Sequence, residues 1–363
     1  MNVNRNDFKP VVPQDMEHLT VYRNEREFSS WPFNAGMWKI AENDILVGFM
    51  NIDCDYANPK QLAHRRVEFF GRIATVRSQD GGRTWGMPET LADNIEINEQ
   101  LNFGASPEVA GVSFGDPRTL LSCWTTPNSG APDAKAWVKL SGDGGRSWGA
   151  AALLPACNIP RFQGRPSYLV RPDGSVLLFL TAKPQHNPYD RPVVYGSYDG
   201  GVNWTLLSYM PASGEYRVIC PSPVMLADGT IVVAVRCKSS MEGAWSEVYV
   251  SEDGGFTWRL RSRINEHGDT VHLTLLQDGR LLAVYGYRIP PFGIRAKISE
   301  DEGRTWGPEL ILRDDGGSKD LGYPRTVEVR PGEVLATYYF NRKDDPIQMN
   351  GGVRYIGGTI LKL

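Results

Sequence analysis

Short apolar segments separated by tight polar turns recur along the whole chain. The first pair is residues 37–40 and 45–49, with Glu42, Asn43 and Asp44 between them. Similar turns, which combine Asp, Gly and Pro in different ways, lie between apolar runs at residues 115–117, 172–174, 227–229, 277–279 and 330–332. Asp-Gly between β-rich runs is a strong hairpin signal, and no amphipathic helical period of useful length competes with it. The pattern predicts six β-hairpins.

An eight-residue motif, S-x-D-x-G-x-[TSN]-W, follows five of these six hairpins. Its copies begin at Ser78, Ser141, Ser197, Ser251 and Ser299, which are 63, 56, 54 and 48 residues apart. Ser and Asp side chains bond backbone amides a few residues further on, and Gly at the fifth position allows a positive φ. The Trp buries a large ring between neighbouring units. We therefore interpret the Asp residues as turn-forming rather than catalytic.

Six hairpins, five of them followed by the motif, give six units of about four strands each. A period of about 50 residues is typical of a repeat architecture with one supersecondary unit per period. The sequence predicts an all-β fold, a six-bladed β-propeller that forms one domain over residues 1–363. In this prediction residues 1–27 complete the last blade and close the ring.

The five motifs resemble the Asp-boxes, or BNR repeats, of the sialidase (neuraminidase) superfamily. The resemblance extends from about residue 28 to the end of the chain. It implies a sialidase-like propeller and an exo-acting glycoside hydrolase that releases a terminal acidic sugar, such as sialic acid, from an oligosaccharide or glycoconjugate. Because one fold hosts several chemistries, three alternatives stay open: a non-sialic glycosidase, a polysaccharide lyase and a non-catalytic glycan-binding propeller.

Composition and charge limit the classes of partner that we expect this chain to bind. The formal net charge is −3 without any basic block, which argues against nucleic acid. The N-terminus lacks an apolar signal core and no segment reaches transmembrane length, so we expect no membrane association. The expected location is cytoplasmic, or periplasmic or secreted if a leader was removed. Five Cys without metal-ligand spacing predict reduced core thiols and neither metal nor other cofactor; the oligomeric state is left open.

In a propeller, residues just before the innermost strands and just after the second strands converge at one mouth of the central channel. The sequence places many Arg, Tyr and acidic residues there, and such a mouth suits an acidic or polyhydroxylated sugar. The substrate-binding candidates are Gln163, Arg165, Arg217, Arg236, Asp269, Arg288 and Arg325. The catalytic candidates are Asp53, Glu215, His272 and Tyr323.

The resemblance implies roles for several of these residues. Sialidases bind the substrate carboxylate with three arginines and use a Tyr, paired with a Glu, as the nucleophile. Arg236 matches the second arginine, and Arg288 matches the third, with Arg295 as the alternative. Tyr323 stands where the nucleophile is expected.

The family's acid/base is a loop Asp, for which Asp53 and Asp55 are the candidates.

Two features of the sialidase family are missing from this sequence. Residues 30–34 read SWPFN where an Arg-Ile-Pro sequence would begin blade one. No Glu lies near residues 220–223, and Glu215 is the nearest acid. These departures leave open whether the sugar is sialic acid.

Two histidines offer another source of proton transfer, because imidazole titrates near neutral pH. A lyase would depend on His272 or His64 and would tolerate Phe at position 323. His64 lies in an insertion of about residues 51–70, which is longer than a hairpin loop needs to be. This insertion either covers the channel mouth or forms an oligomer contact.

Overall fold

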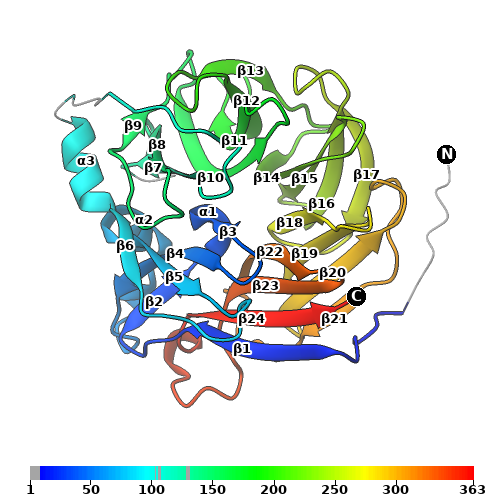
Figure 1. Cartoon of the computed structure of the whole chain (residues 1–363). Helices are drawn as coiled ribbons and strands as arrows, with labels where there is room; N and C mark the ends of the chain where they lie inside the picture. Colours follow the sequence, from blue (N-terminus) through cyan, green and yellow to red (C-terminus); the bar gives the residue numbers. More distant parts are fainter. Residues whose placement is uncertain (1–8, 103, 105–107, 128–130) are drawn as a thin grey trace.

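The computed structural model describes residues 9–102, 104, 108–127 and 131–363, and it shows six antiparallel sheets arranged around a central axis (Figure 1). The predicted six-bladed β-propeller is confirmed. Each sheet is one blade, and the blades follow one another around the ring in chain order.

The first three blades are formed by the following strands: in blade one β2 (Glu27–Ser30), β3 (Met37–Lys39), β4 (Ile45–Asp53), β5 (Arg72–Ser78) and β6 (Glu89–Asp93); in blade two β7 (Leu120–Thr126), β8 (Lys135–Ser141) and β9 (Ala152–Leu153); in blade three β10 (Arg161–Val170), β11 (Val176–Lys183), β12 (Arg191–Ser197) and β13 (Thr205–Tyr209). The last three blades are formed by these strands: in blade four β14 (Arg217–Met225), β15 (Ile231–Ser239), β16 (Gly243–Ser251) and β17 (Arg259–Asn265); in blade five β18 (Val271–Leu275), β19 (Leu281–Tyr287), β20 (Gly293–Ser299) and β21 (Leu310–Arg313); in blade six β22 (Gly322–Arg330), β23 (Glu333–Phe340), β24 (Tyr355–Lys362) and β1 (Met16–Tyr22).

Strand β1 lies at the outer edge of blade six, where it pairs antiparallel with β24. Met16 stands opposite Leu361 and Thr20 opposite Gly357. Chain ends far apart in sequence thus share one sheet. Residues 1–8 of the predicted closing segment lie outside the described residues.

Two blades depart from the four-strand pattern. In blade one the inner strand is split into β2 and β3 by the short helix α1 (Pro32–Ala35), and both pieces pair with β4. In blade two the described residues form three strands, so the first strand of the hairpin predicted around 115–117 is not found among them. There the Val112 amide bonds to the Gly200 carbonyl of blade three.

The loops contain the remaining helices, which are η1 (Pro59–Leu62), α2 (His64–Phe70), α3 (Asn94–Asn102) and η2 (Met349–Gly351). None of the helices in the described residues is long and apolar enough to cross a membrane. All five cysteines are free. Four are buried, but Cys157 is exposed on a loop, so the prediction that all five are core residues is wrong for this one.

The second Asp-box shows how the motif closes on itself and joins blades. The Asp143 carboxylate accepts hydrogen bonds from the hydroxyls of Ser141 and Ser147, at 2.8 and 2.6 Å, and from two backbone amides. Gly145 has a φ of 78°, and a Cβ there would collide with Leu46 of blade one. Trp148 packs on Trp38, also of blade one, with ring centroids 5.7 Å apart. The box therefore ties blade two to blade one.

This arrangement predicts a loss of stability in acid. Hydrogen bonds from the Ser147 hydroxyl and amide lower the pKa of Asp143 to about 2, and the pKa of the other four box Asp residues is lowered as well. An unfolded Asp titrates near pH 3.9. The stabilisation is therefore complete above about pH 4 and is lost as the pH falls towards 2.

We expect the melting temperature to fall steeply over this interval, and Asp143→Asn to reduce that slope. The exposed Asp133 provides the matched control, Asp133→Asn. Identical pH profiles for the parent and Asp143→Asn would contradict the assignment.

Candidate active site

Four residues with positive φ mark the inner ends of four blades. They are Trp31, Arg165, Cys220 and Tyr323, with φ values of 52°, 59°, 55° and 49°. Each is followed directly by a proline, although a residue before proline normally stays extended. The strand register shifts across the last three of these positions. Such strained backbone costs free energy and clusters at functional sites.

Three of these four side chains line one cavity of about 200 Å³. All six blades contribute to its walls, which are formed by Trp31, Asn34, His64, Glu68, Trp124, Gln163, Arg165, Arg217, Ile219, Arg236, Lys238, Arg288 and Tyr323. The cavity is smaller than a drug-sized pocket and suits a single sugar unit. Six of the predicted site residues therefore lie together at the axis: Gln163, Arg165, Arg217, Arg236, Arg288 and Tyr323.

Three guanidinium groups from blades three, four and five form a cationic wall. Arg236 donates from Nη2 to Asp269 Oδ2 at 2.8 Å, and Arg288 Nη1 lies 3.3 Å from the same oxygen. Asp269 is buried behind them, so the predicted substrate ligand instead holds the arginines in place. Arg165 donates to the backbone carbonyl of Gln163 at 2.8 Å. The Nε groups of Arg165 and Arg236 are buried, and neither has a hydrogen-bond partner among the described residues.

The Tyr323 hydroxyl faces these cations. It accepts a hydrogen bond from Arg236 Nη1 at 3.3 Å, and the Arg288 guanidinium lies 5.5 Å from the centroid of its ring. Phe33 and Tyr339 pack edge-on against the ring and fix its position. A negative charge that develops on the hydroxyl oxygen would therefore be stabilised at once by neighbouring guanidinium groups.

A histidine–carboxylate pair stands at the edge of the cavity. His64 Nε2 lies 3.1 Å from Asp320 Oδ1, and the His64 ring packs edge-on against Trp31. The same carboxylate accepts hydrogen bonds from Tyr339 Oη at 2.8 Å and from Arg354 Nε at 3.0 Å. Although burial opposes the charge, His64 and Arg354 hold the pKa of Asp320 well below its usual range. Asp320 is thus a fixed anion that orients the imidazole.

Helix α2 also brings Glu68 to the cavity, where its carboxylate interacts electrostatically with Arg165. Neither Glu68 nor Asp320 was among the predicted site residues, and Lys238 was also missed. The signals were present, because Glu68 lies in the long insertion and Asp320 comes three residues before Tyr323. The insertion reaches the channel mouth, which agrees with the interpretation that it covers this mouth.

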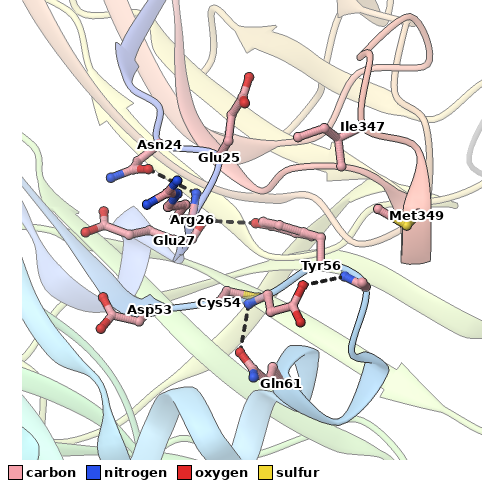
Figure 2. Close-up of a pocket in the computed structure, with 12 residues that line it drawn as sticks. Asn24, Glu25, Arg26, Glu27, Asp53, Cys54, Tyr56, Gln61, Ile347 and Met349 are labelled. Carbon is pink, nitrogen blue, oxygen red and sulfur yellow. Dashed lines mark hydrogen bonds between the residues drawn. The ribbon is translucent and has the colours of Figure 1, made fainter.

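The structure places the predicted acid/base, Asp53, in a different pocket (Figure 2). This pocket has a volume of about 710 Å³ and also contains Asp55, the alternative candidate. Asp53 ends strand β4, and the chain then turns back through a loop that the Gln61 side chain closes with a hydrogen bond from the Asp55 amide at 2.7 Å. Neither carboxylate lines the cavity that contains Tyr323.

Glu215 and Arg295 also lie outside that cavity. Glu215 is exposed beside Tyr216, whose hydroxyl donates to the buried Glu247 at 3.0 Å. Arg295 is buried against the Tyr287 ring and lies 3.5 Å from a carboxylate oxygen of Glu309. The roles predicted for Glu215 and Arg295 therefore have no support from their positions.

His272 and Arg325 are separated from the cavity by helix α1. The Phe33 ring of this helix contacts Tyr323, which lines the cavity, and also contacts His272 and Arg325, which do not. Arg325 donates to the carbonyls of Phe33 and Pro166, which links three blades. Burial, reinforced by Arg325, lowers the pKa of His272 well below its usual value, so this histidine stays neutral. Neither residue lines the cavity that contains Tyr323; both line neighbouring pockets instead.

Comparisons with known proteins give the following similarities. The BNR repeat-like domain family matches residues 118–327. A sialidase of Micromonospora viridifaciens is 30% identical over 215 residues, which are 48% of this chain and 31% of that protein. A Dyadobacter fermentans protein of unknown function has a TM-score of 0.73 and 23% identity, with 96% of this chain and 98% of that one covered. An α-L-arabinanase of Penicillium chrysogenum, complexed with arabinobiose, has a TM-score of 0.63 and 13% identity, with 95% and 97% covered.

Proposed function

The chain belongs to the BNR repeat-like family of the sialidase superfamily, and from that premise we propose that it is a glycoside hydrolase that removes a terminal carboxylated sugar from a glycan. The Micromonospora relative is named a sialidase, and the fold is shared with an arabinanase. Sialic acid is therefore one candidate sugar among several.

One observation carries the proposal: three arginines from three blades converge on a tyrosine hydroxyl inside a cavity of monosaccharide size. Arginine forks match the geometry of a carboxylate, and Arg165, Arg236 and Arg288 all line this cavity. Arg165 supplies the third cation of the wall, although blade one has no Arg-Ile-Pro sequence. The sugar carboxylate would lie against this wall, with its anomeric carbon towards Tyr323.

The reaction would proceed in two steps. Tyr323 Oη passes its proton to the Glu68 carboxylate, which lines the same cavity, and forms a bond to the anomeric carbon as the bond to the leaving oxygen breaks; His64 gives that oxygen a proton. Water then attacks the same carbon and returns a proton to His64, while Tyr323 leaves and takes its own proton back from Glu68. Asp320 holds His64 in one orientation through both steps, much as a carboxylate orients the histidine of a catalytic triad.

The first test is product release from a panel of glycans that end in sialic acid, a uronic acid, rhamnose or fucose, separated by chromatography and identified by mass. Release of one free acidic sugar supports the proposal. Release of a neutral sugar contradicts the carboxylate assignment. Binding without release indicates a glycan-binding propeller instead.

A second candidate is a lyase that acts on a uronic acid, favoured by the histidine–carboxylate pair beside Tyr323. In this reaction a base removes the proton at C5, the bond from C4 to the leaving oxygen breaks, and that oxygen takes up a proton. No water is consumed, and the product contains a conjugated double bond. Ultraviolet absorbance of the released sugar separates the two candidates, because only the lyase product absorbs.

Replacement of His64 by Gln is expected to lower kcat by about 10²- to 10⁴-fold, the usual contribution of a general acid/base. The physical reason is that Gln fits the site but cannot transfer a proton. His267 is exposed on the loop between β17 and β18, so His267→Gln is the matched control. An unchanged kcat in His64→Gln would exclude His64 as the proton donor.

A further inference from the structure

A row of three cations runs outward from the cavity along blade four. Arg236 and Lys238 lie two residues apart on β15 and therefore point to the same face of the sheet. In the pairing of β14 with β15, Arg217 stands directly opposite Lys238. All three side chains line the cavity. Like charges placed directly across an antiparallel pair are destabilising, so this arrangement costs the fold free energy.

The neighbouring carboxylates neutralise this row only in part, because Asp269, the partner of Arg236, also faces Arg288. Arg217 Nε lies 2.6 Å from Asp190 Oδ2, but Asp190 also faces Arg161, at 3.8 Å. Lys238 is exposed, and no side chain within the described residues forms a hydrogen bond or an ion pair with it. Repulsion by Arg236 lowers the pKa of Lys238. An anion bound between Lys238 and Arg217 would remove this repulsion.

The inner and outer cations of this row lie at different depths in the cavity. Arg236 is buried at the inner end, 6% exposed, whereas Lys238 is exposed and Arg217 partly exposed at the outer end. Two residues of strand separate their Cα atoms by about 7 Å. Arg236 therefore lies where a terminal sugar would bind in the cavity, whereas Lys238 and Arg217 lie at its outer end, towards the position of the sugar linked to it.

We propose that Lys238 and Arg217 form a rim subsite that binds a second anionic group, a carboxylate or a sulfate ester, on the sugar adjacent to the one that is cleaved. The inference rests on the proposed function and adds to it the class of glycan: one that carries acidic groups on both of its last two sugars. The rim subsite selects such glycans over those with a neutral second sugar.

The test uses two sets of disaccharides, ending in glucuronic acid or in sialic acid, whose second sugar is neutral, carboxylated or sulfated. We expect kcat/KM to be about 10- to 100-fold higher for an anionic second sugar than for the neutral one, and this ratio to fall as salt is raised, because exposed charges are screened. The carboxylated and sulfated arms show which group the rim subsite prefers. Lys238→Met should bring the ratio close to one, whereas Lys343→Met, a change at an exposed lysine elsewhere, should leave it unchanged.

Affinities of the same disaccharides for Tyr323→Phe, measured by calorimetry, separate the two proposals. If disaccharides with an anionic second sugar bind more tightly than those with a neutral one, but the parent protein hydrolyses none of them, the rim subsite is supported and the hydrolase proposal is overturned. Turnover with equal kcat/KM for neutral and anionic second sugars overturns the rim subsite and leaves the hydrolase standing. Equal affinities in the calorimeter also overturn the rim subsite.

Discussion

Replacement of Tyr323 by Phe is expected to lower kcat by about a thousandfold or more while the propeller stays folded. The change removes the proposed nucleophile and leaves the aromatic ring, which keeps its packing against Phe33 and Tyr339. The hydrogen bond from Arg236 to the hydroxyl, at 3.3 Å, is lost. Steady-state kinetics on the sugar identified by the panel, together with the melting temperature, measure both parts of this expectation.

Tyr338→Phe is the matched control, because Tyr338 is a buried tyrosine whose hydroxyl bonds to Thr359, in the body of blade six. It should keep its kcat. The kinetics also discriminate between the two candidate reactions. Near-normal turnover in Tyr323→Phe combined with a large loss in His64→Gln would exclude tyrosine as nucleophile and favour the lyase.

The fold could be predicted from the sequence because its determinants are local. Each Asp-box closes through hydrogen bonds within eight residues, as between Asp143 and Ser147, and each hairpin turn is equally short-range. Repetition then fixes the number of blades without knowledge of any distant contact. Blade two shows the limit, because Val112 bonds to blade three in place of a strand partner in its own sheet.

The strands also explain which site residues could be predicted. Arg165, Arg236 and Tyr323 lie at repeated positions of their blades, so the blade pattern alone brings them to the axis. Carboxylates in loops follow no such pattern. Asp53, the last residue of β4, lines another pocket, whereas α2, later in the same insertion, brings Glu68 to the cavity.

Long-range contacts explain why the other site residues were missed or misplaced by the sequence pattern. His64 meets Asp320 across 256 residues of sequence, a contact that no spacing encodes. The helix α1 interrupts the inner strand of blade one and inserts Phe33 into the channel, which separates His272 and Arg325 from Tyr323. In a regular propeller without this helix, the pattern would place His272, Arg325 and Tyr323 at the same mouth of the central channel.

The buried carboxylate of Asp269 provides the second large expected effect, on stability. It is 5% exposed and faces the guanidinium groups of both Arg236 and Arg288. Asp269→Asn keeps the shape but leaves the buried Arg236 and the partly buried Arg288 without their counterion, a change that costs about 3–5 kcal/mol. For a chain of this length that loss corresponds to a melting temperature lower by about 4–7 °C. Glu252→Gln, at an exposed pair with Arg259, is the control and should change the melting temperature little.

Asp269→Asn is also expected to be stabilised by ligand more strongly than the parent. With the carboxylate gone, the arginine wall has more uncompensated positive charge, so a bound sugar carboxylate stabilises the variant more than the parent, provided that its binding geometry is kept. Saturating acidic monosaccharide should therefore raise the melting temperature of Asp269→Asn by more than it raises that of the parent. Equal melting temperatures without ligand would show that Asp269 is not the counterion of the wall. A smaller ligand-induced rise in the variant would show that Asp269 contributes mainly by orienting Arg236 and Arg288, and that the loss of this orientation outweighs the added charge.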